Sequence, residues 1–225
     1  MKCNLSKIIP NIGLLIVVLY PILGRWFIRS LPLGLEGRWI FWLGLNLLVM
    51  FGLLYLSRYI KKKMSVQSTR KKQYKVAIMI LGFFALLAWA MVVQTYFPKT
   101  QNETLLATNL NQVHTYFRYV LVAVICVIAP IYEEIIFRYL VMKRFVKQFS
   151  DIWSIFLSAT LFSLGHLRQL SVTDFMTYFV MGLIFAGIYR HTQSIYYSMT
   201  LHIIWNSLPY IVYFLVFVID LITKQ

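Results

Sequence analysis

Two adjacent glutamates, Glu133 and Glu134, lie inside a long apolar stretch that begins near Tyr119 and ends near Met142. A stretch of this length and composition is typical of a helix that crosses a membrane. An ionised side chain inside a bilayer costs roughly several kcal/mol unless it has a partner or faces a polar cavity. Arg138 follows Glu134 by four residues, which places both on one face of a helix. This stretch therefore predicts a membrane helix that borders a polar site.

The composition agrees with a membrane protein. Hydrophobic residues make up 60% of the 225 residues and charged residues 13%, which leaves too little polar surface for a soluble domain of this length. The net charge is +15, and the largest cluster of lysines and arginines lies between two apolar runs, from Arg58 to Lys75. Contact with anionic lipid headgroups explains such a cluster, so we expect the lipid bilayer as a partner and no nucleic acid. Two cysteines are too few for a disulfide framework.

The apolar runs predict an all-α fold, a polytopic transmembrane bundle of about eight helices. The bundle has seven helices if the last run is one helix kinked at Pro209. Small residues in the sixth run, Gly182, Ala186 and Gly187, suit close helix contact. Residues 97–112 are polar and are predicted to form a loop. The expected spans are 8–23, 39–59, 76–96, 116–142, 152–167, 174–189, 195–208 and a short 209–222.

The positive-inside rule predicts the orientation of these spans. It places the N-terminus, the basic segments 58–75 and 143–147, and Arg190 in the cytoplasm. The small size and the lysine-rich loops favour a multi-pass protein of a bacterial plasma membrane. Arginines at 25, 29 and 38, between the first two spans, fit this orientation badly, and Arg168 also falls on the outer side.

Two later spans carry further polar residues at helical spacing. Phe162 and His166 are four residues apart, as are His202 and Asn206, so each pair shares one helix face. Three helices that each present one polar stripe are what a buried site between helices requires. Taken singly, these residues have structural explanations, such as helix packing for His166 and an interhelical hydrogen bond for His202. Their joint occurrence favours a catalytic site.

Hydrolysis is the chemistry that fits these residue types. A carboxylate in a low-dielectric site is a stronger base than in water and can accept a proton from a water molecule. A neighbouring histidine can orient that water, and histidine and amide groups can stabilise an oxyanion. Ser163 is a weak candidate nucleophile, since hydroxyl residues are common at helix contacts. His114 and His191 lie near loops, and we expect both to be exposed to solvent.

The three motifs, Glu133-Glu134-x-x-x-Arg138, Phe162-x-x-x-His166 and His202-x-x-x-Asn206, together resemble the signature of the CPBP family. This family contains CAAX-type membrane endopeptidases and the bacteriocin-processing or immunity proteins also called Abi. The resemblance covers about Val120 to Tyr210. It implies a division into residues 1–115, with membrane helices and a basic cytoplasmic loop, and residues 116–225, a catalytic transmembrane core.

The resemblance also implies roles for individual residues. Glu133 would activate water with help from His166, and His202 and Asn206 would form the oxyanion pocket. Glu134 would be held by Arg138 and would support or join the catalysis, with Phe162 as structural support. Glu133, His166 and His202 could instead hold a zinc ion, although they lack the His-Glu-x-x-His spacing of common zinc peptidases. A zinc site and a metal-free glutamate mechanism both remain open.

Two classes of function follow. The first is an intramembrane endopeptidase acting on a membrane-associated peptide or protein, such as a leader peptide, pheromone or bacteriocin, in processing or self-immunity. The second is a non-proteolytic immunity or regulatory protein that binds a peptide or sensor partner. One feature conflicts with a common site for these residues. The predicted spans put Glu133 and His166 at depths in the membrane that differ by about 15 Å, at ~1.5 Å of rise per residue.

Overall fold

The computed structural model describes residues 30–45, 47–48, 51, 70–142 and 150–223. The predicted span 8–23, much of span 39–59 and most of the basic loop lie outside these residues. The described part is helical and contains no strand. Within it, four helical runs are long and apolar enough to cross a membrane, which confirms an all-α membrane bundle: Lys72–Tyr96, Thr115–Met142, Val172–Thr192 and Ile195–Thr223.

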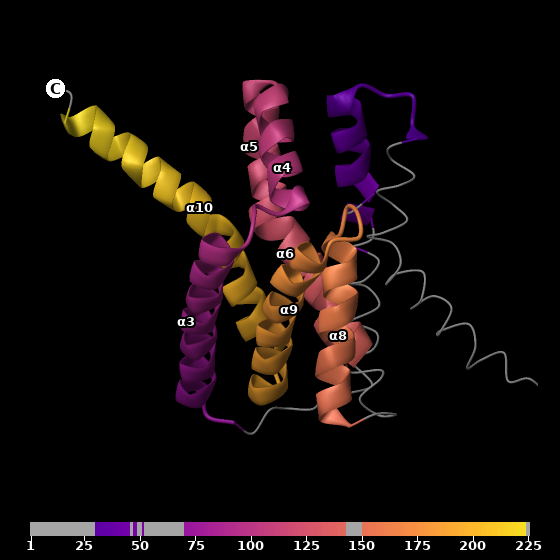
Figure 1. The fold of residues 1–225 in the computed structure, drawn as a ribbon, viewed down its shortest axis with the longest axis vertical. Helices are drawn as coiled ribbons and strands as arrows, with labels where there is room; N and C mark the ends of the chain where they lie inside the picture. The colour runs from indigo at the N-terminus through magenta and orange to yellow at the C-terminus, as the bar shows by residue number, and fades with distance from the viewer. Residues whose placement is uncertain (1–29, 46, 49–50, 52–69, 143–149, 224–225) are drawn as a thin grey trace, which may run out of the picture.

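The helices follow the apolar runs closely (Figure 1). Span 116–142 is one continuous helical run that changes its hydrogen-bonding pattern three times, because it begins as the α-helix α5 and two π-helical stretches then flank the short α6 that carries both glutamates. A further helix covers residues 35–45. The labelled elements are α3 (Lys72–Tyr96), α4 (Gln101–Gln112), α5 (Thr115–Ala123), η1 (Val124–Ile128), α6 (Ala129–Glu134), η2 (Ile135–Met142), α8 (Asp151–His166), α9 (Val172–Thr192) and α10 (Ile195–Thr223).

The last apolar run forms one helix, α10, with Pro209 in its interior. Of the two alternatives that the sequence left open, the single kinked helix is therefore the one observed. A proline removes one backbone donor and kinks a helix, but it need not end it. Figure 1 shows the C-terminal part of α10 turning away from the other helices.

Residues 97–112 contain a helix, so the predicted loop was wrong. Thr100 caps α4: its Oγ1 accepts a hydrogen bond from the Glu103 backbone N–H at 3.2 Å, and its own N–H donates to the Glu103 carboxylate at 3.1 Å. This reciprocal arrangement is a capping box. Asp174 at the start of α9 accepts a further hydrogen bond from the Gln101 N–H at 3.1 Å, which ties α4 to α9. The polar composition had concealed a helix start that the Thr-x-x-Glu pattern signals.

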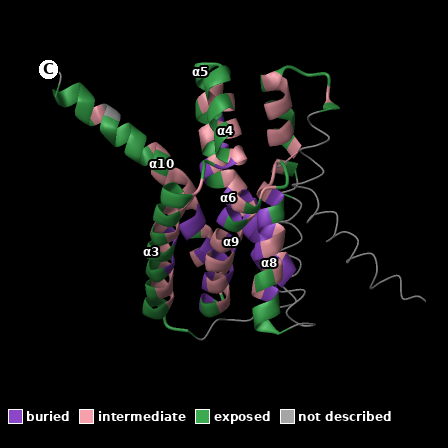
Figure 2. Ribbon diagram, viewed as in Figure 1, coloured by how far each residue is buried: buried purple, intermediate pink, exposed green. Residues whose placement is uncertain are grey.

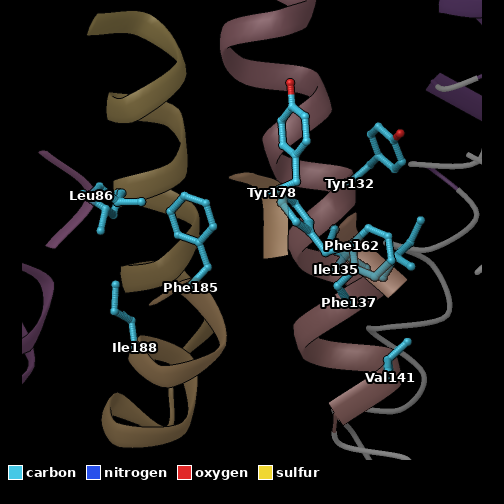
Figure 3. Packing of buried hydrophobic residues seen from close by; sticks show 11 residues of the cluster. Leu86, Tyr132, Ile135, Phe137, Val141, Phe162, Tyr178, Phe185 and Ile188 are labelled. Atoms are coloured by element: carbon cyan, nitrogen blue, oxygen red, sulfur yellow. The ribbon is translucent and has the colours of Figure 1, made fainter. Parts of the chain in front are cut away.

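The core lies where α9 packs against α8, α3 and α10 (Figure 2). Aromatic and aliphatic side chains of η2, α8 and α9 interlock there, with Phe137, Phe162 and Phe185 almost fully buried (Figure 3). A Cβ added at Gly182 would lie 2.9 Å from the Ala159 Cα, so the predicted small-residue face does allow α8 and α9 to approach closely. A Cβ added at Gly187 would have no atom within 4 Å, so close helix contact does not require a glycine at this position.

Helix α3, the run 115–142, α8, α9 and α10 alternate in direction, which separates two ends of the bundle (Figure 1). The starts of α3, α8 and α10 and the end of α9 share one end, which we call the basic end because Lys71, Lys72 and Arg190 lie there. The opposite end holds α4, α5, the helix over 35–45 and the α8–α9 connection. We call it the pocket end.

Candidate active site

Glu133 faces a cavity at the pocket end of the bundle. The cavity has a volume of about 350 Å³, and its lining includes Glu133, His166 and Asn206. Glu133 retains 8% exposure, whereas its neighbour Glu134 is fully buried and does not line the cavity. The 100° rotation between successive helix residues therefore directs the two carboxylates to different surroundings.

Glu134 makes an ion pair inside the core. Its Oε2 lies 3.4 Å from the Arg138 Nε, and both side chains are fully buried. Arg138 also donates from Nη1 to the Ser158 hydroxyl at 3.3 Å, and its guanidinium carbon lies 4.9 Å from the centre of the Phe162 ring. A charge that is both paired and stacked on an aromatic ring can be kept in an apolar interior. The arginine thereby joins the helical run of the glutamates to α8.

His202 lies between the two carboxylates. Its Nδ1 is 3.1 Å from Glu134 Oε1, and its Nε2 is 3.7 Å from Glu133 Oε2. The imidazole stacks on Phe185 at 4.4 Å between ring centres and is only 1% exposed. His202 is not among the residues that line the cavity. A histidine in this position couples Glu133 electrostatically to the buried ion pair.

His166 approaches Glu133 from the end of α8. Its Nε2 is 3.8 Å from Glu133 Oε1, and its Nδ1 is 2.9 Å from the Phe162 carbonyl oxygen. Since a carbonyl only accepts, Nδ1 carries the proton of this hydrogen bond, and the second ring nitrogen faces the glutamate. Tyr178 of α9 stacks on the imidazole with ring centres 4.4 Å apart. The ring is therefore fixed from two sides.

Tyr178 is itself anchored to α4. Its hydroxyl lies 3.1 Å from Thr100 Oγ1 and 3.4 Å from Asn102 Nδ2. Arg168 donates to Asn102 Oδ1 from Nε at 3.2 Å and from a terminal nitrogen at 3.1 Å. The helix that the sequence missed thus supports the histidine through a chain of polar contacts.

Asn206 reaches the cavity from α10. Its Nδ2 donates to the Ile125 carbonyl at 3.2 Å. Ile125 belongs to η1, and π-helical turns commonly occur at functional sites because they alter the backbone pattern locally. The amide nitrogen carries two hydrogens, so a second donor remains for a ligand in the cavity.

The predicted conflict in depth does not exist in the structure, because Glu133 and His166 are in contact range. The helical run that carries Glu133 has 28 residues, whereas α8 has 16 and ends at His166. Figure 1 shows α5 extending beyond the end of α8, so a glutamate inside the long run lies level with the last turn of the short helix. The mismatch came from judging the depth of each residue within its own predicted span, although the two spans differ in length.

The remaining polar candidates lie outside this cluster. The Ser163 hydroxyl donates to the Phe175 carbonyl at 2.6 Å and joins α8 to α9. His114 and His191 are exposed, as expected. The sequence did not identify the other polar and aromatic side chains of the cavity, which include Arg38, Trp39, Trp42, Asn102, Asn109 and Arg168.

A zinc ion was one of the two possibilities for Glu133, His166 and His202. Over residues 30–45, 47–48, 51, 70–142 and 150–223, no group of three His, Cys, Asp or Glu side chains is arranged to hold a metal. The described geometry does not fit a resident metal as it stands.

One comparison with known proteins gives a match. Residues 115–208 match the family model for the type II CAAX prenyl endopeptidase Rce1-like proteins. No curated protein and no solved structure matches the chain. The matched segment runs from the start of α5 to the part of α10 that carries Asn206, and it contains all three motifs.

Proposed function

Residues 115–208 belong to the Rce1-like type II CAAX prenyl endopeptidase family, and from this membership we propose that the chain is an intramembrane endopeptidase. The substrate is a membrane-associated peptide or protein. The observation that carries this proposal is the position of Glu133, which lines the cavity with an imidazole nitrogen within 4 Å of each carboxylate oxygen.

Glu133 acts as the general base. The distance of 3.8 Å between Glu133 Oε1 and His166 Nε2 is too long for a direct hydrogen bond. It suits a water molecule that contacts both atoms, since polar groups at such separations are commonly bridged by water. With its proton on Nδ1, a neutral His166 would accept a hydrogen bond from this water at Nε2 and so orient it, and Glu133 would take the other proton of the water.

The reaction then follows the usual course of amide hydrolysis. The water oxygen attacks the carbonyl carbon of the scissile bond as its proton moves to Glu133. The carbonyl oxygen becomes an oxyanion, which the second N–H of the Asn206 amide stabilises. The carbon–nitrogen bond breaks as the proton held by Glu133 passes to the departing amine, which restores the carboxylate.

Glu134, Arg138 and His202 position Glu133 in this scheme. The resemblance had implied that His202 donates to the oxyanion, but its 1% exposure and its two carboxylate neighbours favour a supporting role. Phe162 supports three groups at once, since its ring contacts Arg138, His166 and His202. Asn206 remains the better candidate for the oxyanion.

The metal question is open to a direct measurement. The scheme above uses only side chains of the chain, so we expect the purified protein to contain no stoichiometric zinc and to keep its activity in chelator. Metal analysis together with chelator inhibition tests this. A stoichiometric zinc ion whose removal abolishes cleavage would replace Glu133 as the group that activates water.

The biological role that we propose is processing of a leader peptide, pheromone or bacteriocin at a bacterial plasma membrane, or self-immunity that depends on such cleavage. The informative experiment compares peptide termini in membranes from cells that carry the wild-type protein or Glu133→Gln at equal abundance. We expect termini that occur only with the wild type, which would identify both activity and substrate. Identical termini, with a phenotype retained by Glu133→Gln, would instead support a non-proteolytic immunity or regulatory protein.

A further inference from the structure

The cavity carries positive charge at a position where the chain should have little. By the positive-inside rule, arginines are expected at the basic end, yet Arg38 and Arg168 lie at the pocket end, and both line the cavity. The charged residues among the described lining are these two arginines and Glu133. The two arginines that did not fit the predicted orientation therefore lie in the candidate active site.

Arg38 is only partly satisfied in the described structure. Its Nε is buried and has no hydrogen-bond partner among the described residues. A buried donor of a charged group without a partner is unfavourable, so an acceptor supplied by a ligand would stabilise it. Arg168 is oriented by its two hydrogen bonds to Asn102 Oδ1.

The acidic residues of the neighbouring elements are engaged in helix capping and connections. Glu36 accepts a hydrogen bond from the His114 N–H at 2.9 Å. Glu103 completes the capping box of α4, and Asp174 accepts from the Gln101 N–H. None of these three carboxylates lines the cavity, so Glu133 is the one carboxylate among its described lining residues.

From this arrangement, and resting on the proposed endopeptidase function, we propose that Arg38 and Arg168 bind a carboxylate of the substrate peptide. The planar guanidinium fork matches a carboxylate with two parallel hydrogen bonds. Because the arginines share one cavity with Glu133 and His166, a carboxylate bound there lies on the peptide that is cleaved. The carboxylate belongs either to the free C-terminus or to an acidic side chain near the scissile bond.

A retention experiment tests this assignment. The probes are three pools of synthetic nonapeptides randomised over neutral residues: one with a free carboxyl terminus, one with a C-terminal amide, and one with the amide and a single aspartate. Each pool is incubated with phosphatidylcholine vesicles that contain the protein, and retained peptides are counted by mass spectrometry. All proteins carry Glu133→Gln so that bound peptides stay intact.

We expect the protein to retain the free-acid pool, the aspartate pool, or both at least about tenfold better than the neutral amide pool. Preference for the free-acid pool alone would identify the C-terminal carboxylate as the bound group. Preference for the aspartate pool would identify an acidic side chain as the bound group. Arg38→Gln and Arg168→Gln should each remove most of the preference, while Arg38→Lys should retain part of it. Arg118→Gln is the matched control, since Arg118 carries the same charge at the same end but does not line the cavity.

Equal retention of the three pools, or a preference that survives both arginine substitutions, would overturn the proposal. Loss of the preference when phosphatidylglycerol is added would also overturn it, because the arginines would then hold lipid headgroups. The same pools incubated with protein that has Glu133 intact test the proposed function separately. Selective retention without any cleavage would refute the endopeptidase and leave the carboxylate site standing.

Discussion

Glu133 and Glu134 are neighbours in the chain, but their surroundings differ. One lines a cavity and has imidazole nitrogens at 3.7 and 3.8 Å from its two oxygens, which leaves room for water. The other is fully buried, paired with Arg138 at 3.4 Å and bound to His202 at 3.1 Å. We therefore assign proton transfer to Glu133 and structural support to Glu134.

This assignment predicts that Glu134→Gln destabilises the protein. Removing one partner of a buried ion pair leaves the other charge uncompensated, and we expect a loss of about 3–5 kcal/mol in the free energy of unfolding. Thermal melting in detergent should show a clearly lower midpoint. The expected loss is large because Arg138 cannot reach water from its position.

The matched control is Asp151→Asn. Asp151 pairs with Arg190 at the basic end, where both side chains are substantially exposed. A surface pair contributes about 0–1 kcal/mol, so its melting midpoint should barely change. Equal effects of the two substitutions would show that the buried pair carries no special structural role.

At this scale, helical spacing predicted the contacts within one continuous helical run. Glu134 and Arg138, four residues apart, do pair, and Phe162 and His166, also four apart, share a hydrogen bond. Contacts between distant residues were not predictable in this way. Tyr178 stacks on His166 but is fixed by Thr100, a residue 78 positions away, and no periodicity in the sequence relates them.

At the scale of elements, the apolar runs located the helices because burial in a bilayer requires about 20 apolar residues in succession. The π-helical stretches on either side of α6 were not predictable, since the apolar pattern of the sequence runs through them without a break. Helix α4 was missed because its polarity outweighed the Thr100–Glu103 capping pattern. Its identification would have brought Asn102 and Asn109 into consideration for the site.

The contact between α8 and α9 gives a prediction at the element scale. Gly182→Ala should lower the free energy of unfolding by about 1–3 kcal/mol, because the new methyl group would lie 2.9 Å from the Ala159 backbone. Gly187→Ala on the same helix meets open space and should be neutral or stabilising by up to about 1 kcal/mol. Melting midpoints of the two variants test this, and similar losses for both would contradict close packing at Gly182.

At the scale of the whole molecule, the candidate site lies at the end of the bundle away from Lys71, Lys72 and Arg190 (Figure 1). The positive-inside rule places that basic end in the cytoplasm. We therefore propose that the cavity opens toward the outer side of the membrane, where a secreted or outward-facing peptide would meet it.

Cysteine labelling of intact cells tests this orientation. Leu170 in the α8–α9 connection is 98% exposed at the pocket end, and His191 is exposed at the basic end. A membrane-impermeant maleimide should label Leu170→Cys in intact cells and His191→Cys only after permeabilisation, with Cys3 and Cys126 replaced by alanine in both variants. The reverse labelling pattern would show that the bundle has the opposite orientation in the membrane.

The central claim is that Glu133 performs the chemistry and does not hold the fold together. The most direct test uses the substrate identified from the peptide termini that occur only with the wild-type protein. It measures cleavage of this substrate by purified Glu133→Gln protein in vesicles, together with the melting midpoint of the Glu133→Gln protein. We predict that cleavage falls by at least about 10²–10⁴-fold, the usual contribution of a general base, while the midpoint stays close to that of the wild type. Undiminished cleavage by a folded Glu133→Gln protein, or a loss that tracks unfolding, would contradict the claim.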